Sequence, residues 1–99
     1  MIIDLHTHAF PDRLAARALA ALEEHSGDYK ALLDGTVGGL LRSMDQAGVD
    51  VAAVCSIATS PRQVDSILQW SEEIAGERII PFPSVHPAGD CARQVREIA

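Results

Sequence analysis

One nearly continuous apolar run, from Val49 to Ile57, most constrains what this chain can fold into. A run of this length without polar alternation is typical of a β-strand that is covered on both faces of a parallel sheet. A helical pattern over 37–47 precedes it almost without a linker, and Gly48 suits the left-handed position after a last helical turn. A helix that leads directly into a buried strand is a crossover unit, so we expect an α/β fold.

Two further apolar runs predict strands, and no hairpin signal separates any of the three. The expected strands therefore run parallel and are joined by crossover helices. We place the strands at about 2–8, 49–57 and 79–86. Helices are expected at about 11–24 and 37–47, a third from the capping box at 60–63 to Gly76, and a fourth beginning after Gly89. Residues 25–35 are expected to form a loop with one helical turn, so that 9–35 extends beyond the carboxyl end of the first strand. In the third strand, the missing N–H groups of Pro81 and Pro83 should leave one side poorly hydrogen-bonded.

Charge and hydropathy exclude several classes of function. Fourteen acidic residues against eight basic ones give a net charge of −6, and the basic residues form no cluster, so nucleic acid is not an expected partner. No apolar stretch approaches the roughly 18 residues of a membrane helix, and the N-terminus lacks the features of a secretory signal. A cytoplasmic location is therefore expected. Cys55 and Cys91 form no CxxC pair and are interpreted as reduced, apolar-type thiols.

His6 and His8 are the residues most able to carry chemistry. Side chains alternate along a strand, so the two imidazoles project to one face, with Cα atoms about 6–7 Å apart. Asp4 shares this parity. Neutral imidazoles at that spacing suit Zn²⁺, and also Fe²⁺, Mn²⁺ or Co²⁺, when further ligands complete the shell. The alternative is that both are polar residues at a strand end, satisfied by backbone groups and water.

Other candidates are less specific. His86 should end the third strand, where it could contact substrate or support a ligand, or its ring could simply bond to loop backbone. Arg13 and Arg17 could meet an anionic substrate, although exposed arginines are common. His25 is expected to be solvated, and Trp70 to pack at the surface or at an interface.

The segment Ile3 to His8, followed by Phe10 and Pro11, resembles the opening of the amidohydrolase-related family (amidohydrolase family 2) of metal-dependent TIM-barrel hydrolases and decarboxylases. The passage from Met44 to Val49 into the second strand is similar to that family too, as is the Val85-His86-Pro87 ending of the third. The resemblance covers essentially the whole chain. Its His-x-His element is shared with other superfamilies.

The resemblance implies that His6 and His8 hold a divalent metal, most simply Zn²⁺, together with a histidine from a middle strand and an aspartate from the last strand. The metal would activate water for hydrolysis, or bind a carboxylate substrate for decarboxylation. A small carboxylate or amide is the implied substrate. A closed (β/α)8 barrel needs roughly 250 residues. The 99 residues are therefore expected to be the N-terminal, incomplete portion of a barrel, a single segment that is inactive alone.

Two alternatives remain open. The polymerase-and-histidinol-phosphatase type of phosphoesterase also opens with Asp-x-His-x-His, but its multi-metal cluster needs further histidines and acids that do not follow here. A non-catalytic α/β module that assembles with copies of itself is the other, because three parallel strands leave two open edges and an uncovered face. Partners are thus a small molecule and either a second copy or the remaining barrel, with no nucleic acid and no membrane.

Overall fold

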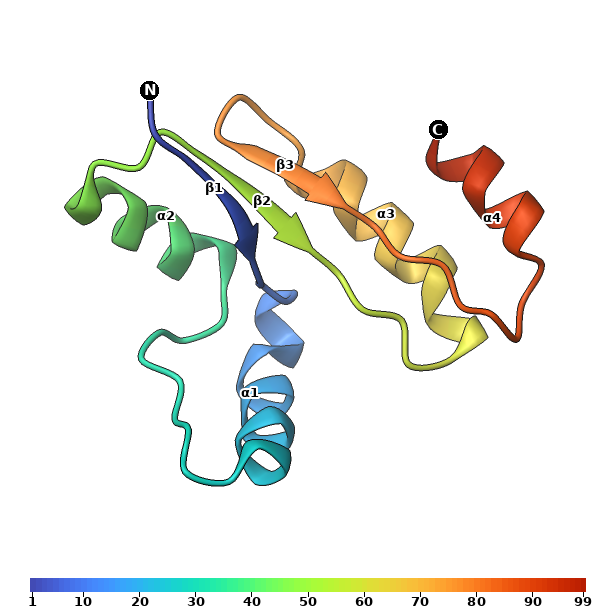
Figure 1. Cartoon of the computed structure of the whole chain (residues 1–99), viewed down its shortest axis with the longest axis horizontal. Helices are drawn as coiled ribbons and strands as arrows, with labels where there is room; N and C mark the ends of the chain where they lie inside the picture. Colours follow the sequence, from blue (N-terminus) through green and yellow to red (C-terminus); the bar gives the residue numbers. More distant parts are fainter.

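The structure is a computed structural model that describes residues 1–99, and it has the α/β architecture expected from the sequence (Figure 1). Its elements in chain order are β1 (Ile3–Thr7), α1 (Asp12–Ser26), α2 (Val37–Ala47), β2 (Val51–Cys55), a 3₁₀ turn η1 (Pro61–Gln63), α3 (Val64–Ile74), β3 (Ile79–Phe82) and α4 (Cys91–Ile98). The three strands form one parallel sheet in the order β1-β2-β3. Strands that neighbour one another in both sequence and space are what helical crossovers produce.

Each strand is shorter than its apolar run. The ladder between β2 and β3 ends where Cys55 pairs with Phe82, so the residues predicted as strand beyond these positions lie in loops. The chain leaves the sheet after Phe82. The carbonyls of Arg78, just before β3, and of Phe82 accept hydrogen bonds from the N–H groups of Ala52 and Ser56. By alternation, Pro81 turns its backbone nitrogen to the free edge. The expected shortage of donors on one side of this strand is confirmed.

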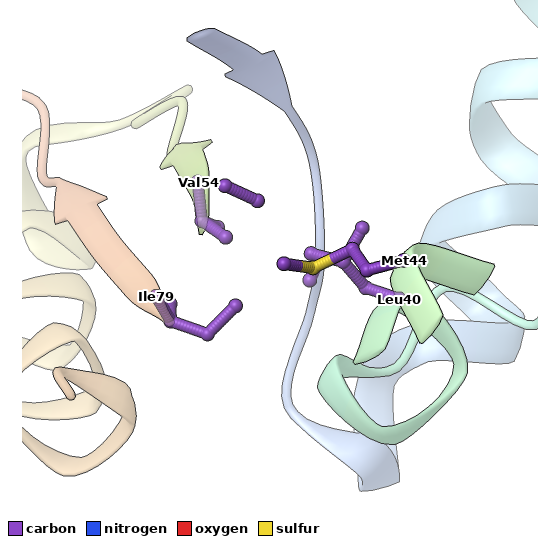
Figure 2. Close-up of a cluster of buried hydrophobic side chains, with 6 residues drawn as sticks. Leu40, Met44, Val54 and Ile79 are labelled. Carbon is purple, nitrogen blue, oxygen red and sulfur yellow. The ribbon is translucent and has the colours of Figure 1, made fainter. Parts of the chain in front are cut away.

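Both crossover helices pack on the same face of the sheet. Ala52 and Val54 of β2 are fully buried there, together with Ile79 of β3. Leu40 and Met44 reach into this cluster from α2, as Figure 2 shows, while Trp70 and Ile74 of α3 pack against its margin. Trp70, which was expected to pack at the surface or at an interface, is half-buried against this margin of the core.

The other face of the sheet, called here the open face, carries no helix. Its side chains are those of Ile3, Val51, Ala53, Cys55, Ile80 and Phe82, because partners in a parallel ladder project to the same side. Ile80 is 46% exposed and Phe82 53% exposed. Ala53 of the central strand is 2% exposed, so the exposed apolar area of this face lies on the edge strands β1 and β3. Apolar faces of sheets are normally covered.

Local signals set the ends of α2. The Thr36 side chain accepts a hydrogen bond from the Gly39 N–H at 2.9 Å, and Gly48 follows the last turn with a φ of 70°. At the next helical start, the Gln63 side chain accepts from the Ser60 N–H at 3.3 Å, as the capping pattern predicted.

The segment from α1 to residue 35 extends beyond the carboxyl end of β1, away from the sheet (Figure 1). The helix runs two residues further than expected, to Ser26, and Ala15 is its only buried residue. None of the helices combines the length and the hydropathy needed to cross a bilayer.

Candidate metal centre

The rings of His6 and His8 meet at the carboxyl end of β1. Their Nε2 atoms lie 3.2 Å apart, with ring centroids at 5.0 Å and planes inclined by 73°. Both residues are exposed. The expectation that the two imidazoles converge is confirmed by this geometry, whereas their service as metal ligands stays a prediction.

The separation of the two Nε2 atoms fits a shared ion. Nitrogen ligands at about 2.1 Å from a tetrahedral ion are about 3.4 Å apart, close to the observed spacing. The same distance also fits one N–H···N hydrogen bond between the two Nε2 atoms, which can link the rings when no ion is bound. The donor set, two imidazoles, is one that Zn²⁺ and its first-row neighbours accept.

The tautomer of His8 follows from its neighbour. Its Nδ1 lies 2.8 Å from the carbonyl oxygen of Cys55 at the end of β2. A carbonyl oxygen only accepts, so Nδ1 carries the proton and donates it. In the neutral ring the lone pair is then on Nε2, the atom that faces His6. Metal-binding histidines generally have their second ring nitrogen held in this way.

An irregularity in β1 separates Asp4 from the histidines. Asp4 pairs with Ala52 and Thr7 with Val54, so three steps along β1 match two along β2. Residues Asp4–Thr7 thus form a β-bulge with one extra residue. The expectation that Asp4 shares the face of the histidines is wrong for this reason, because a one-residue shift reverses which face each later side chain occupies. Its carboxylate instead accepts a hydrogen bond from the His6 N–H at 3.1 Å.

His86 does not end a strand. β3 stops at Phe82, and His86 lies in the loop before α4. Its Nδ1 accepts from the Ala88 N–H at 3.2 Å, and its own N–H donates to the buried Gln94 side chain at 3.0 Å. The ring is therefore bonded to loop backbone, and no contact joins it to His6 or His8. A role in substrate contact stays a prediction.

The remaining candidates lie apart from the pair. His25 donates from Nδ1 to the Ala21 carbonyl at 2.7 Å and remains exposed on α1. Arg13 lines a shallow hollow of about 440 Å³ with Phe10, Trp70 and Glu73. A second hollow of about 300 Å³ lies against the end of α1, and no histidine lines either one.

No group of three or more histidine, cysteine, aspartate or glutamate side chains is placed to surround one ion. Both cysteines are free thiols, as expected. His6 and His8 alone would leave an ion's shell to be completed by other donors.

Sequence reasoning assigned Asp4 to the wrong face and missed two other contributors to this centre. The two are Thr7 of the bulge and the backbone carbonyl of Cys55. A carbonyl has no signature in the sequence. The short polar residue between the two histidines was the available signal for Thr7, since its hydroxyl can bond to neighbouring backbone.

Comparisons with known proteins add no relative. No protein-family model matches the chain, no curated protein matches it, and no solved structure matches it. The chemistry of the pair therefore has to be argued from this chain alone.

Proposed function

We propose that this chain supplies the first metal ligands, His6 and His8, of a metal-dependent hydrolase or decarboxylase of the amidohydrolase type. The observation that carries the proposal is the 3.2 Å approach of two exposed Nε2 atoms, one of them with its lone pair set by a backbone acceptor. Polar groups at the carboxyl ends of parallel strands are where α/β enzymes assemble their sites.

Zn²⁺, or another divalent ion, when bound lowers the pKa of a water molecule toward about 7 and polarises a carbonyl or carboxylate oxygen. The contribution of this chain is to hold two neutral imidazoles at the edge of the open face. The second part of the proposal is that further strands of a (β/α)8 barrel cover this face and bring the remaining ligands. The exposed Ile80 and Phe82 side chains support it, because barrel interiors are filled by such residues.

Calorimetric titration of the 99-residue chain with Zn²⁺ and Co²⁺ tests the ligand assignment. We expect one ion per chain. His6→Ala and His8→Ala should each weaken binding at least tenfold, because a single imidazole cannot chelate. His25→Ala is the matched control, since that ring is also exposed but bonded to its own helix.

Binding that survives loss of both His6 and His8 would refute the proposal, as would equal losses in the His25→Ala control. The reaction type is decided on a longer chain that carries further strands. Turnover of an amide, an ester or an unsaturated carboxylic acid that depends on His6 supports the amidohydrolase type. Turnover of a phosphate monoester alone supports the phosphoesterase alternative.

A second candidate function, self-assembly, is favoured by the same open face. Ile80 and Phe82 of β3 would be covered by a second copy of the chain, together with Ile3 of β1, which is 46% exposed on the same face. If the chain assembles with copies of itself and binds no metal, its function is structural rather than catalytic. A defined oligomer whose formation is indifferent to His6 and His8 distinguishes this candidate from the enzyme.

A further inference from the structure

The bulge Asp4–Thr7 decides which face of the sheet the histidines occupy. Before it, Ile3 pairs with Val51 and lies on the open face. After it, Thr7 pairs with Val54 on the helix-covered face, and Ala9 is buried in the core cluster on that same side. Ile3 and Ala9 have the same parity yet lie on opposite faces, so the extra residue has reversed the alternation.

The histidines alternate with Thr7 and Ala9 and therefore lie on the open side. In an unbroken strand that kept the pairing of Asp4 with Ala52, His6 would pair with Val54 and turn toward the helices. Val54 is fully buried, so an imidazole on that face would have to displace core packing. The bulge thus makes the exposed position of the pair compatible with the apolar core.

Two side chains satisfy the backbone where the bulge disrupts the ladder. Asp4 Oδ1 accepts a hydrogen bond from the His6 N–H at 3.1 Å. Thr7 Oγ1 donates to the Ala53 carbonyl at 2.8 Å, one residue before His8 donates from Nδ1 to the Cys55 carbonyl at 2.8 Å. The two acceptors are alternate carbonyls of β2, so both point to β1 and together fix the end of that strand.

We propose that Asp4 and Thr7 are positioning residues of the histidine pair: they stabilise the bulge that turns both rings to the open face and sets the Nδ1–H tautomer of His8. The importance of this for metal binding rests on the proposed function. The effect on the tautomer does not, because it belongs to the metal-free chain.

The test uses four variants of the full chain. Thr7→Val removes the hydroxyl at nearly constant shape, and Thr7→Ser restores a donor. Asp4→Ala removes the acceptor, and Asp4→Asn keeps an oxygen in place. Thr59→Val is the control, since its hydroxyl bonds to Gln63 in the loop after β2.

The first readout is the His8 tautomer, measured by ¹⁵N NMR of the metal-free chain at alkaline pH, where imidazoles are neutral. We expect Nδ1–H to dominate in the wild type, in Thr7→Ser, in Asp4→Asn and in Thr59→Val. In Thr7→Val and Asp4→Ala its population should fall toward that of a free imidazole. The second readout is the dissociation constant for Co²⁺, which should rise 10- to 100-fold in the same two variants, as for other groups that orient metal ligands.

The outcomes separate the two proposals. A shifted tautomer in a chain that binds no metal upholds the positioning role and overturns the proposed function. Unchanged tautomer and Co²⁺ affinity in folded Thr7→Val and Asp4→Ala overturn the positioning role, even if both variants melt at lower temperature. If circular dichroism shows one of the two to be unfolded, the other decides.

Discussion

At the scale of single residues, Asp34 organises the turn that begins α2. Its Oδ1 accepts hydrogen bonds from the Thr36 hydroxyl at 2.7 Å and the Thr36 N–H at 2.9 Å, and Arg42 lies 3.3 Å from Oδ2. The hydroxyl bond, then the N–H bond, and more weakly the charge of Arg42 hold the pKa of Asp34 below its ordinary 3.8. Gly39 belongs to the same unit, because a Cβ there would overlap the Asp34 carboxylate.

A carboxylate whose pKa is lower in the folded state than in the unfolded state stabilises the folded state. This stabilisation is fully present when the pH is above the unfolded-state pKa, and it is lost as the pH falls through the folded-state pKa. We therefore expect Asp34→Asn to reduce the melting temperature by a constant amount from neutral pH down to about pH 5. The difference from wild type should shrink below 3.8 and vanish in stronger acid. Melting curves followed by circular dichroism across this range check it. Asp28→Asn, on the exposed loop before Asp34, is the control, and a difference that grows in acid would contradict the assignment.

At the scale of the elements, features set by neighbouring residues were predictable. Helix α2 begins and ends where the sequence places it, because Thr36 and Gly48 act within one turn of the chain. The ends of the strands were not predictable, because each depends on how far the partner strand continues. His86 was assigned to a strand for this reason, although the pairing stops at Phe82.

The candidate site divides in the same way. Alternation along one strand was enough to bring His6 and His8 together, since the two residues are neighbours on a single segment. The face they occupy could not be derived, because the bulge is defined only by the register of β1 against β2. The acceptor of His8, the Cys55 carbonyl, is 47 residues away in sequence and comes close only through that pairing.

Two glycines provide a matched test of how α2 ends. Gly48 has a φ of 70°, and nothing lies within 4 Å of a Cβ built there; Gly76 has equally free space but an ordinary φ. We expect Gly48→Ala to lower the free energy of unfolding by about 1 kcal/mol, because an L-residue is strained in the left-handed region. Gly76→Ala should change it little. Urea unfolding measures both, and equal effects would show that backbone conformation is not the cause.

At the scale of the whole molecule, the covered and open faces of the sheet differ sharply. Val54 is fully buried beneath α2 and α3, whereas Phe82 across the sheet is 53% exposed. Exposed apolar side chains on an uncovered face of a sheet favour association. The free edge of β3 lacks an N–H donor at Pro81, which disfavours the addition of another strand there. Two copies of the chain are therefore expected to associate through their open faces.

We therefore expect the 99-residue chain to associate increasingly with concentration, and Phe82→Ser to weaken that association. Ile57→Ser is the control, because Ile57 is 66% exposed but lies after the end of β2, outside the open face. Sedimentation velocity over a concentration series provides the measurement. A wild-type chain that stays monomeric throughout would show that the open face is tolerated in water and needs no cover.

The proposed metal centre requires His6 and His8 to hold one divalent ion between them. Anomalous diffraction at the zinc edge, from crystals of the chain grown with Zn²⁺, tests it most directly. We expect one strong peak about 2.1 Å from both Nε2 atoms, with the His8 Nδ1 still bonded to the Cys55 carbonyl. A map with no peak between the two rings, or with zinc bound only at His25 or His86, would contradict it.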